Sequence, residues 1–160
     1  MSDVYSLSGC VSPQFDDYVN YWRHNGFWLF DSPRIIELLA QEHDVSLDGM
    51  KLFYYEAHEE EFDDERNRWV PFGSEEAFGT AIDVPAEKTL EGFDVTGFMQ
   101  HTTPECSPLS CNSLAESIPT NAHCLLSTFD EAVKALESGA FRNAEPGPYR
   151  IIAVYSVKAA

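Results

Sequence analysis

The sequence predicts an α+β fold, with a single mixed or antiparallel sheet of about five strands and three to four helices packed mainly on one face. Segments with apolar residues at helical spacing alternate with short runs of aromatic and β-branched residues, which are typical of strands. The chain also passes twice through the same order of elements, at residues 27–56 and 124–157: a short apolar strand, a Ser or Thr cap, a helix, a Gly-containing turn and a long strand. The strands of each unit can be parallel or antiparallel, so the connectivity stays open. Because the 160 residues contain no Gly/Ser linker or low-complexity block, one domain over residues 1–160 is expected.

In the first half of the chain, cap and breaker residues bound two predicted helices. A Ser-Pro pair at residues 12–13 begins the first helix, and Gly26 ends it. Pro33 begins the second helix, whose buried face is expected to comprise Ile35, Ile36, Leu38 and Leu39. The segments that favour strands are residues 4–7, 27–30 and 51–62.

In the second half, a hairpin is followed by loops, a capped helix and a final strand. The polar residues 63–68 predict a turn that returns the chain along residues 69–72. Thr128 and Glu131 have the spacing of a capping box, and Gly139 ends the helix that the box opens. The remaining expected elements are strands at 93–99, 124–126 and 149–157 and a short helix at 113–118, with residues 73–91 mostly in a loop.

Negative charge excludes several classes of partner. The chain has 27 Asp and Glu residues against 10 Lys and Arg residues, for a formal net charge of −17. Nucleic acids and anionic membranes are recognised by clustered Lys and Arg, so neither is expected to bind. No apolar stretch approaches the roughly 20 residues that span a bilayer, and the N-terminus lacks the pattern of a secretory signal. These observations favour a cytoplasmic protein, although adaptation to a high-salt habitat would also account for the acidity.

The carboxylates are concentrated in one segment. Seven of the ten residues from Glu56 to Glu65 are acidic, directly after the aromatic run at residues 52–55. Because carboxylates fall on both faces of a strand beyond His58, that part of the strand is expected to project from the sheet with both sides in water. Such a segment fits a docking surface for a basic protein, a solvated hairpin end that blocks edge-to-edge pairing, or a divalent-metal site. The residues expected to bind a partner are Glu56, Glu59, Glu60, Glu61, Asp63, Asp64, Tyr54, Phe62 and Trp69.

Cysteine and histidine residues form a second candidate site. His101, Cys106, Cys111, His123 and Cys124 lie within 24 residues, but their spacing is poor for zinc. Cys111 is the best candidate nucleophile, with His101 or His123 as its base and Asn112 or Asn121 as the residue that orients the base. The surrounding acidity counts against this site because it raises the pKa of a thiol. Reduced thiols, no bound metal and no cofactor are therefore expected.

The sequence thus favours a small acidic, cytoplasmic, non-enzymatic protein that docks a basic protein surface. Inhibitors, immunity-type proteins and mimics of nucleic-acid charge belong to this class. No P-loop, dinucleotide-binding, nucleophile-elbow or zinc-protease motif is present. The alternative is an enzyme with a Cys/His site, or a zinc-supported domain around Cys106, Cys111 and Cys124. The oligomeric state is open.

Overall fold

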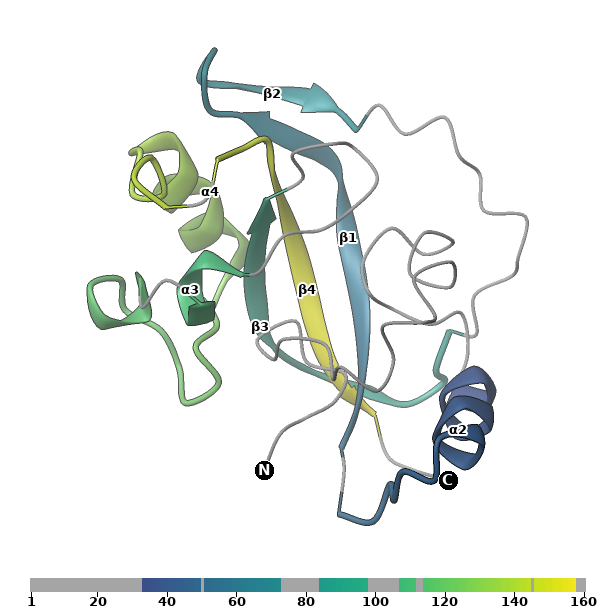
Figure 1. Cartoon of the computed structure of the whole chain (residues 1–160). Helices are drawn as coiled ribbons and strands as arrows, with labels where there is room; N and C mark the ends of the chain where they lie inside the picture. The colour runs from purple at the N-terminus through teal and green to yellow at the C-terminus, as the bar shows by residue number, and fades with distance from the viewer. Residues whose placement is uncertain are drawn as a thin grey trace.

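A four-stranded antiparallel sheet organises the structure, a computed structural model that describes residues 33–49, 51–72, 84–97, 107–111, 114–144 and 146–157. The strand order is β2-β1-β4-β3 (Figure 1). The strands are β1 (Leu52–Asp63), β2 (Arg68–Pro71), β3 (Lys88–Gly97) and β4 (Tyr149–Val157). The helices are α2 (Pro33–Glu42), α3 (Pro108–Cys111), α4 (Phe129–Glu137) and the 3-10 turn η2 (Leu114–Glu116).

This architecture corrects the predicted fold class in strand number and helix number, and of the two sheet types that the sequence left open it has the antiparallel one. The described residues form four strands, all antiparallel, and only α2 and α4 are helices longer than four residues. Residues 124–126 do not form a strand, because Cys124 has a φ of 58° and only Leu126 makes a bridge, to Phe93. The predicted elements at residues 4–7, 12–26 and 27–30 lie outside the described residues.

The strand β3 begins five residues earlier than the sequence indicated. Its pairing with β4 shifts register between Leu90 and Gly92, and Gly92 has a φ of 151°. A glycine within a strand often marks such a bulge. Because Gly92 breaks the strand pattern of the sequence, residues 88–91 were not expected to belong to the strand. The hairpin of β1 and β2 was predicted correctly, and so were the bounds of β4.

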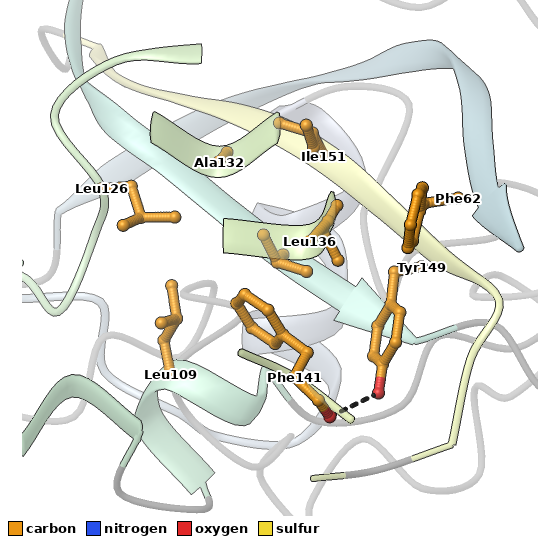
Figure 2. Close-up of a cluster of buried hydrophobic side chains, with 9 residues drawn as sticks. Phe62, Leu109, Leu126, Ala132, Leu136, Phe141, Tyr149 and Ile151 are labelled. Atoms are coloured by element: carbon orange, nitrogen blue, oxygen red, sulfur yellow. Dashed lines mark hydrogen bonds between the residues drawn. The ribbon is translucent and has the colours of Figure 1, made fainter. Parts of the chain in front are cut away.

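The core lies between one face of the sheet and the helix α4. It consists of Phe62, Val95, Leu109, Leu126, Ala132, Leu136, Phe141, Tyr149 and Ile151. Figure 2 shows Ala132 and Leu136 of α4 beside Ile151 and Tyr149 of β4. The Tyr149 hydroxyl donates a hydrogen bond of 3.0 Å to the Phe141 carbonyl, so the one polar atom of this large ring is satisfied inside the core.

The helix α2 buries Ile36, Leu39 and Ala40. Leu38 is 48% exposed, so its predicted place on the buried face was wrong. Residues 36, 39 and 40 form one stripe at helical spacing, and Leu38 lies well outside that stripe. Among the described residues, no helix combines the length and the apolar character that crossing a membrane would require.

The capping box at the start of α4 is confirmed. The backbone N–H of Glu131 donates to the Thr128 hydroxyl at 3.2 Å, and the Glu131 carboxylate accepts from the backbone N–H of Thr128 at 3.2 Å. Thr128→Ala is expected to lower the free energy of unfolding by about 1 kcal/mol, because the helix loses its N-cap. Thr128→Ser keeps the hydroxyl and is the control, with a change of a few tenths of a kcal/mol. Urea denaturation measures both, and equal midpoints for the two variants would contradict a capping role.

Candidate functional site

The acidic run forms the hairpin of β1 and β2. Glu60 to Asp63 pair with Pro71 to Arg68, and residues 64–67 make the turn. The expectation that both faces of this strand lie in water was wrong, since Glu61 is 5% exposed and Phe62 is 2% exposed. The physical reason is that Phe62 points into the core under α4, while Glu61 points to the other face, where it lies beside Arg150 of β4.

The strand β1 has a bulge at the start of the acidic hairpin, where its pairing with β4 shifts register. Ala57 pairs with Ile152 and Glu61 with Arg150, so residues 58–60 lie opposite a single residue of β4. The Nε of Arg150 donates to the His58 carbonyl at 2.6 Å, and the guanidinium lies 3.8 Å from the ring centroid of Phe72. Burial lowers the pKa of Arg150 to about 10, while the nearby Glu61 carboxylate raises it. Arg150 therefore fills the bulge and fixes the position of the hairpin.

Among the described residues, three of the seven carboxylates lie beside a cation. Arg150 faces Glu61, Lys88 binds Glu56, and the Arg66 guanidinium lies 3.1 Å from Asp63. Asp63 also accepts from the backbone N–H of Arg66 at 2.9 Å, so it stabilises the hairpin turn.

Of the four remaining carboxylates, three define the acidic surface (Glu59, Glu60 and Glu65). All three are exposed, and within the described part of the chain none forms an ion pair with Lys or Arg. The His58 imidazole lies 3.7 Å from Glu60. Asp64, which is half-buried beside Gly147, contributes less to this surface.

The three aromatic residues expected to contact a partner are already engaged by the fold. Phe62 lies in the core, which removes it from the expected contact surface (Figure 2). Trp69 packs on Phe62 with ring centroids 5.2 Å apart and donates from Nε1 to the Glu137 carboxylate at 3.1 Å. Trp69 is half-buried and so keeps part of its ring at the surface, next to the His58 ring at 6.0 Å.

Tyr54 belongs to a cluster that sequence reasoning missed. Tyr54, Glu56 and Tyr155 form what we call the ammonium cage, which surrounds the Nζ of Lys88. The Nζ lies 4.7 Å from the Tyr54 ring centroid and 4.3 Å from the Tyr155 ring centroid, and it donates to Glu56. The Tyr155 hydroxyl donates to the same carboxylate at 2.9 Å. No sequence signal pointed to this cluster, since it depends on the register of three strands.

The ionisation of the ammonium cage follows from these contacts. The hydrogen bond from Lys88 lowers the pKa of Glu56, and the same bond raises the pKa of Lys88. Burial, followed by the hydrogen bond to Glu56, raises the pKa of Tyr155. Burial and the Glu56 charge likewise raise the pKa of Tyr54. At neutral pH the site therefore holds one ammonium, one carboxylate and two neutral phenols.

The Cys/His candidates are only partly within the described residues. His101, Cys106 and Asn112 lie outside them, and nothing is described of the Cys111 side chain. Cys124 is a free, half-buried thiol. Within the described ranges, no three His, Cys, Asp or Glu side chains are grouped so that they could hold a metal ion.

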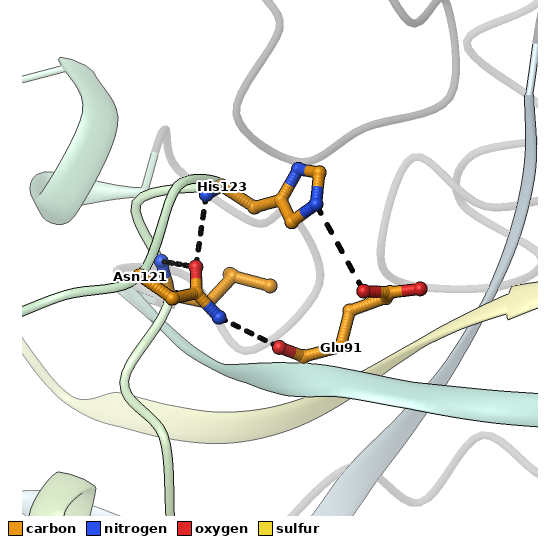
Figure 3. A network of polar contacts seen from close by, with 4 residues as sticks. Glu91, Asn121 and His123 are labelled. Carbon is orange, nitrogen blue, oxygen red and sulfur yellow. Dashed lines mark hydrogen bonds and ion pairs between the residues drawn. The ribbon is translucent and has the colours of Figure 1, made fainter.

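His123 and Asn121 belong to a network that holds a loop against β3 (Figure 3). The Asn121 side chain donates to the Glu91 carbonyl at 2.7 Å and accepts from the backbone N–H of His123 at 2.9 Å. The His123 ring is 3.9 Å from the Glu91 carboxylate. Among the described residues, the Asn121 amide bonds to backbone groups, so its expected role in orienting a histidine side chain stays a prediction.

Asp94 is a buried carboxylate that forms no ion pair with Lys or Arg within the described part of the chain. It is 1% exposed, and one of its oxygens accepts hydrogen bonds from the Ser107 hydroxyl at 2.5 Å and the Val95 backbone N–H at 2.8 Å. Burial raises its pKa to about 6, although both hydrogen bonds act in the opposite direction. The contact with Ser107 joins β3 to the start of α3.

Comparison with known proteins gives no family for this chain. No family model, curated protein or solved structure matches it.

Proposed function

We propose that this is a non-enzymatic protein that docks a basic surface of a partner protein through the acidic surface. The observation that supports this is the exposure of Glu59, Glu60 and Glu65 on one hairpin, without Lys or Arg partners in the described residues. Charges arranged in this way accelerate encounter with a positive patch and orient it.

The hairpin is fixed at both of its strands, which favours binding. Arg150 holds β1 at the bulge, and Trp69 of β2 is tied to Glu137 of α4. A pre-organised surface loses less conformational entropy when it binds than a flexible one. In the proposed complex the accessible parts of Trp69 and His58 supply contacts beside the charges.

The class of partner follows from the chemistry of the surface. A basic enzyme or toxin that is inhibited by this protein, or a protein that normally binds nucleic acid, has a positive patch of the required kind. A cytoplasmic location belongs to the same proposal and is supported by the free thiol of Cys124. No observation in the described residues favours the Cys/His enzyme or the zinc-supported domain.

Affinity capture with matched variants tests this proposal. The test variant combines Glu59→Gln, Glu60→Gln and Glu65→Gln. The control variant combines Glu42→Gln, Asp48→Asn and Glu116→Gln, which removes the same charge from exposed positions elsewhere. From an extract of the native host, wild type and control are expected to capture a common basic protein, and the test variant at least about tenfold less of it. Equal capture by all three proteins would overturn the proposal.

A further inference from the structure

The walls of the ammonium cage are set by the pairing of two strands. Tyr54 of β1 lies directly opposite Tyr155 of β4, and Glu56 follows two residues later on the same face of the sheet. The hydrogen bond from Tyr155 to Glu56 joins two of the three walls without any contribution from Lys88. The strand register therefore places the three walls side by side, and the bond between Tyr155 and Glu56 adds a contact that does not involve Lys88.

Lys88, whose ammonium group lies in the cage, comes from a different strand, β3. Lys88 is the first residue of β3, where it pairs with Val157, and its side chain reaches across β4 to Glu56 on β1. Its stem is a flexible four-carbon chain that carries a compact charge. The side chains of Lys88 and Glu56 are 25% and 40% exposed, so the cage is open to solvent on one side.

The chemistry of the walls is that of a site for ammonium groups. Two aromatic faces attract a cation through their quadrupoles, and a carboxylate supplies the opposite charge. We propose that Tyr54, Glu56 and Tyr155 form a binding site for an alkylammonium group, and that Lys88 occupies it as an internal ligand that an external ammonium displaces. The external ligand of matching chemistry is a lysine side chain on a basic partner, and this choice of source rests on the proposed function.

Displacement has a quantitative consequence. A tethered ligand acts as a competitor with an effective concentration of roughly millimolar or more. Apparent affinity falls with the fraction of protein whose cage is empty, so if Lys88 occupies the cage at least about 90% of the time, an external alkylammonium binds wild-type protein at least about tenfold more weakly than protein that lacks the Lys88 amine.

The experiment uses n-butylammonium chloride as the probe, because its chain and charge reproduce a lysine side chain. Thermal unfolding and the tyrosine ring signals in NMR spectra are followed in wild type, Lys88→Ala and Lys134→Ala, with sodium chloride at equal ionic strength as the reference. Lys134 is an exposed lysine of α4 and controls for loss of charge. We expect the probe to raise the midpoint of Lys88→Ala and shift its tyrosine signals, with an effect at least about tenfold smaller in the other two proteins.

A second substitution tests whether Glu56 is part of the ammonium-binding site. Adding Glu56→Gln to Lys88→Ala is expected to abolish the response to butylammonium. An equal response in wild type and Lys88→Ala, or a response that survives Glu56→Gln, would overturn the proposal. If Lys88→Ala does not fold, Lys88→Thr, which suits a strand, takes its place. The acidic surface is intact in all of these proteins, so failure here leaves the partner-binding proposal standing, and failure of partner capture leaves amine binding measurable.

Discussion

Replacing Asp94 by Asn is expected to raise the free energy of unfolding by about 3 kcal/mol at pH 8. Burial raises the folded-state pKa of Asp94 to about 6, roughly two units above its ordinary value. A carboxyl whose pKa is raised by folding contributes most stability when it is protonated, and this contribution is lost as pH rises from about 4 to about 6. Asn carries no charge at any of these pH values, and its side-chain oxygen can still accept from Ser107 and from the Val95 N–H.

The pH dependence separates this effect from a general gain in stability. The advantage of Asp94→Asn over wild type is expected to be about 3 kcal/mol at pH 8 and about half as large at pH 5, measured by urea denaturation. Asp48→Asn, at an exposed position, serves as the control and is expected to change stability by less than about 0.5 kcal/mol. A variant that is less stable than wild type at pH 8, or a difference that does not vary with pH, would show that the Asp94 carboxylate is stabilised in the folded protein.

Replacing Gly92 by Ala is expected to lower the free energy of unfolding by about 3 kcal/mol. A Cβ at this position would lie 2.7 Å from the Leu126 carbonyl oxygen and 2.8 Å from the Leu125 Cβ. The backbone φ of 151° is also one that residues with a side chain rarely adopt. To remove the collision, the segment at residues 121–126 has to move away from β3, which strains the hydrogen bond between Asn121 and Glu91.

The Gly49→Ala substitution separates backbone strain from steric collision as causes of destabilisation. Gly49 also has a positive φ, of 75°, but a Cβ there would meet no atom within 4 Å. Its substitution is therefore expected to cost only about 1 kcal/mol, from backbone strain alone. Denaturation midpoints measure both variants. If the two substitutions destabilise the protein equally, close packing of the loop on β3 makes no contribution at Gly92.

Local signals in the sequence identified the elements whose structure depends on adjacent residues. The Thr128 and Glu131 capping box, the turn between β1 and β2, and the alternating pattern of residues 149–157 each act over a few positions. The strand order could not be found in this way. The pattern suggested two strand–helix–strand units. In the structure, β4 lies antiparallel between β1 and β3. Its pairing with β1 joins residues far apart in the sequence, such as Leu52 and Val157.

In the candidate site, too, features that depend on adjacent residues were predictable from the sequence, and features that depend on strand pairing were not. The concentration of carboxylates in one hairpin was visible in the sequence, but the burial of Glu61 and Phe62 was not, because it depends on pairing with β4. The bulge that brings Arg150 to the His58 carbonyl gave no sequence signal. Tyr54 was expected to anchor a partner, and its place in the ammonium cage follows only from its position opposite Tyr155.

In the proposed function, the acidic surface guides association with a basic partner. The most direct test is the association rate of the captured basic protein with wild type, with the variant lacking the charges of Glu59, Glu60 and Glu65, and with the charge-matched control. Surface plasmon resonance at about 50 mM and about 200 mM salt provides these rates, since screening acts on exposed charges in this range. Wild type and control are expected to associate rapidly at low salt and to slow down at high salt, while the test variant is slow at both. A test variant that associates as fast as wild type, with the same dependence on salt, would contradict the account.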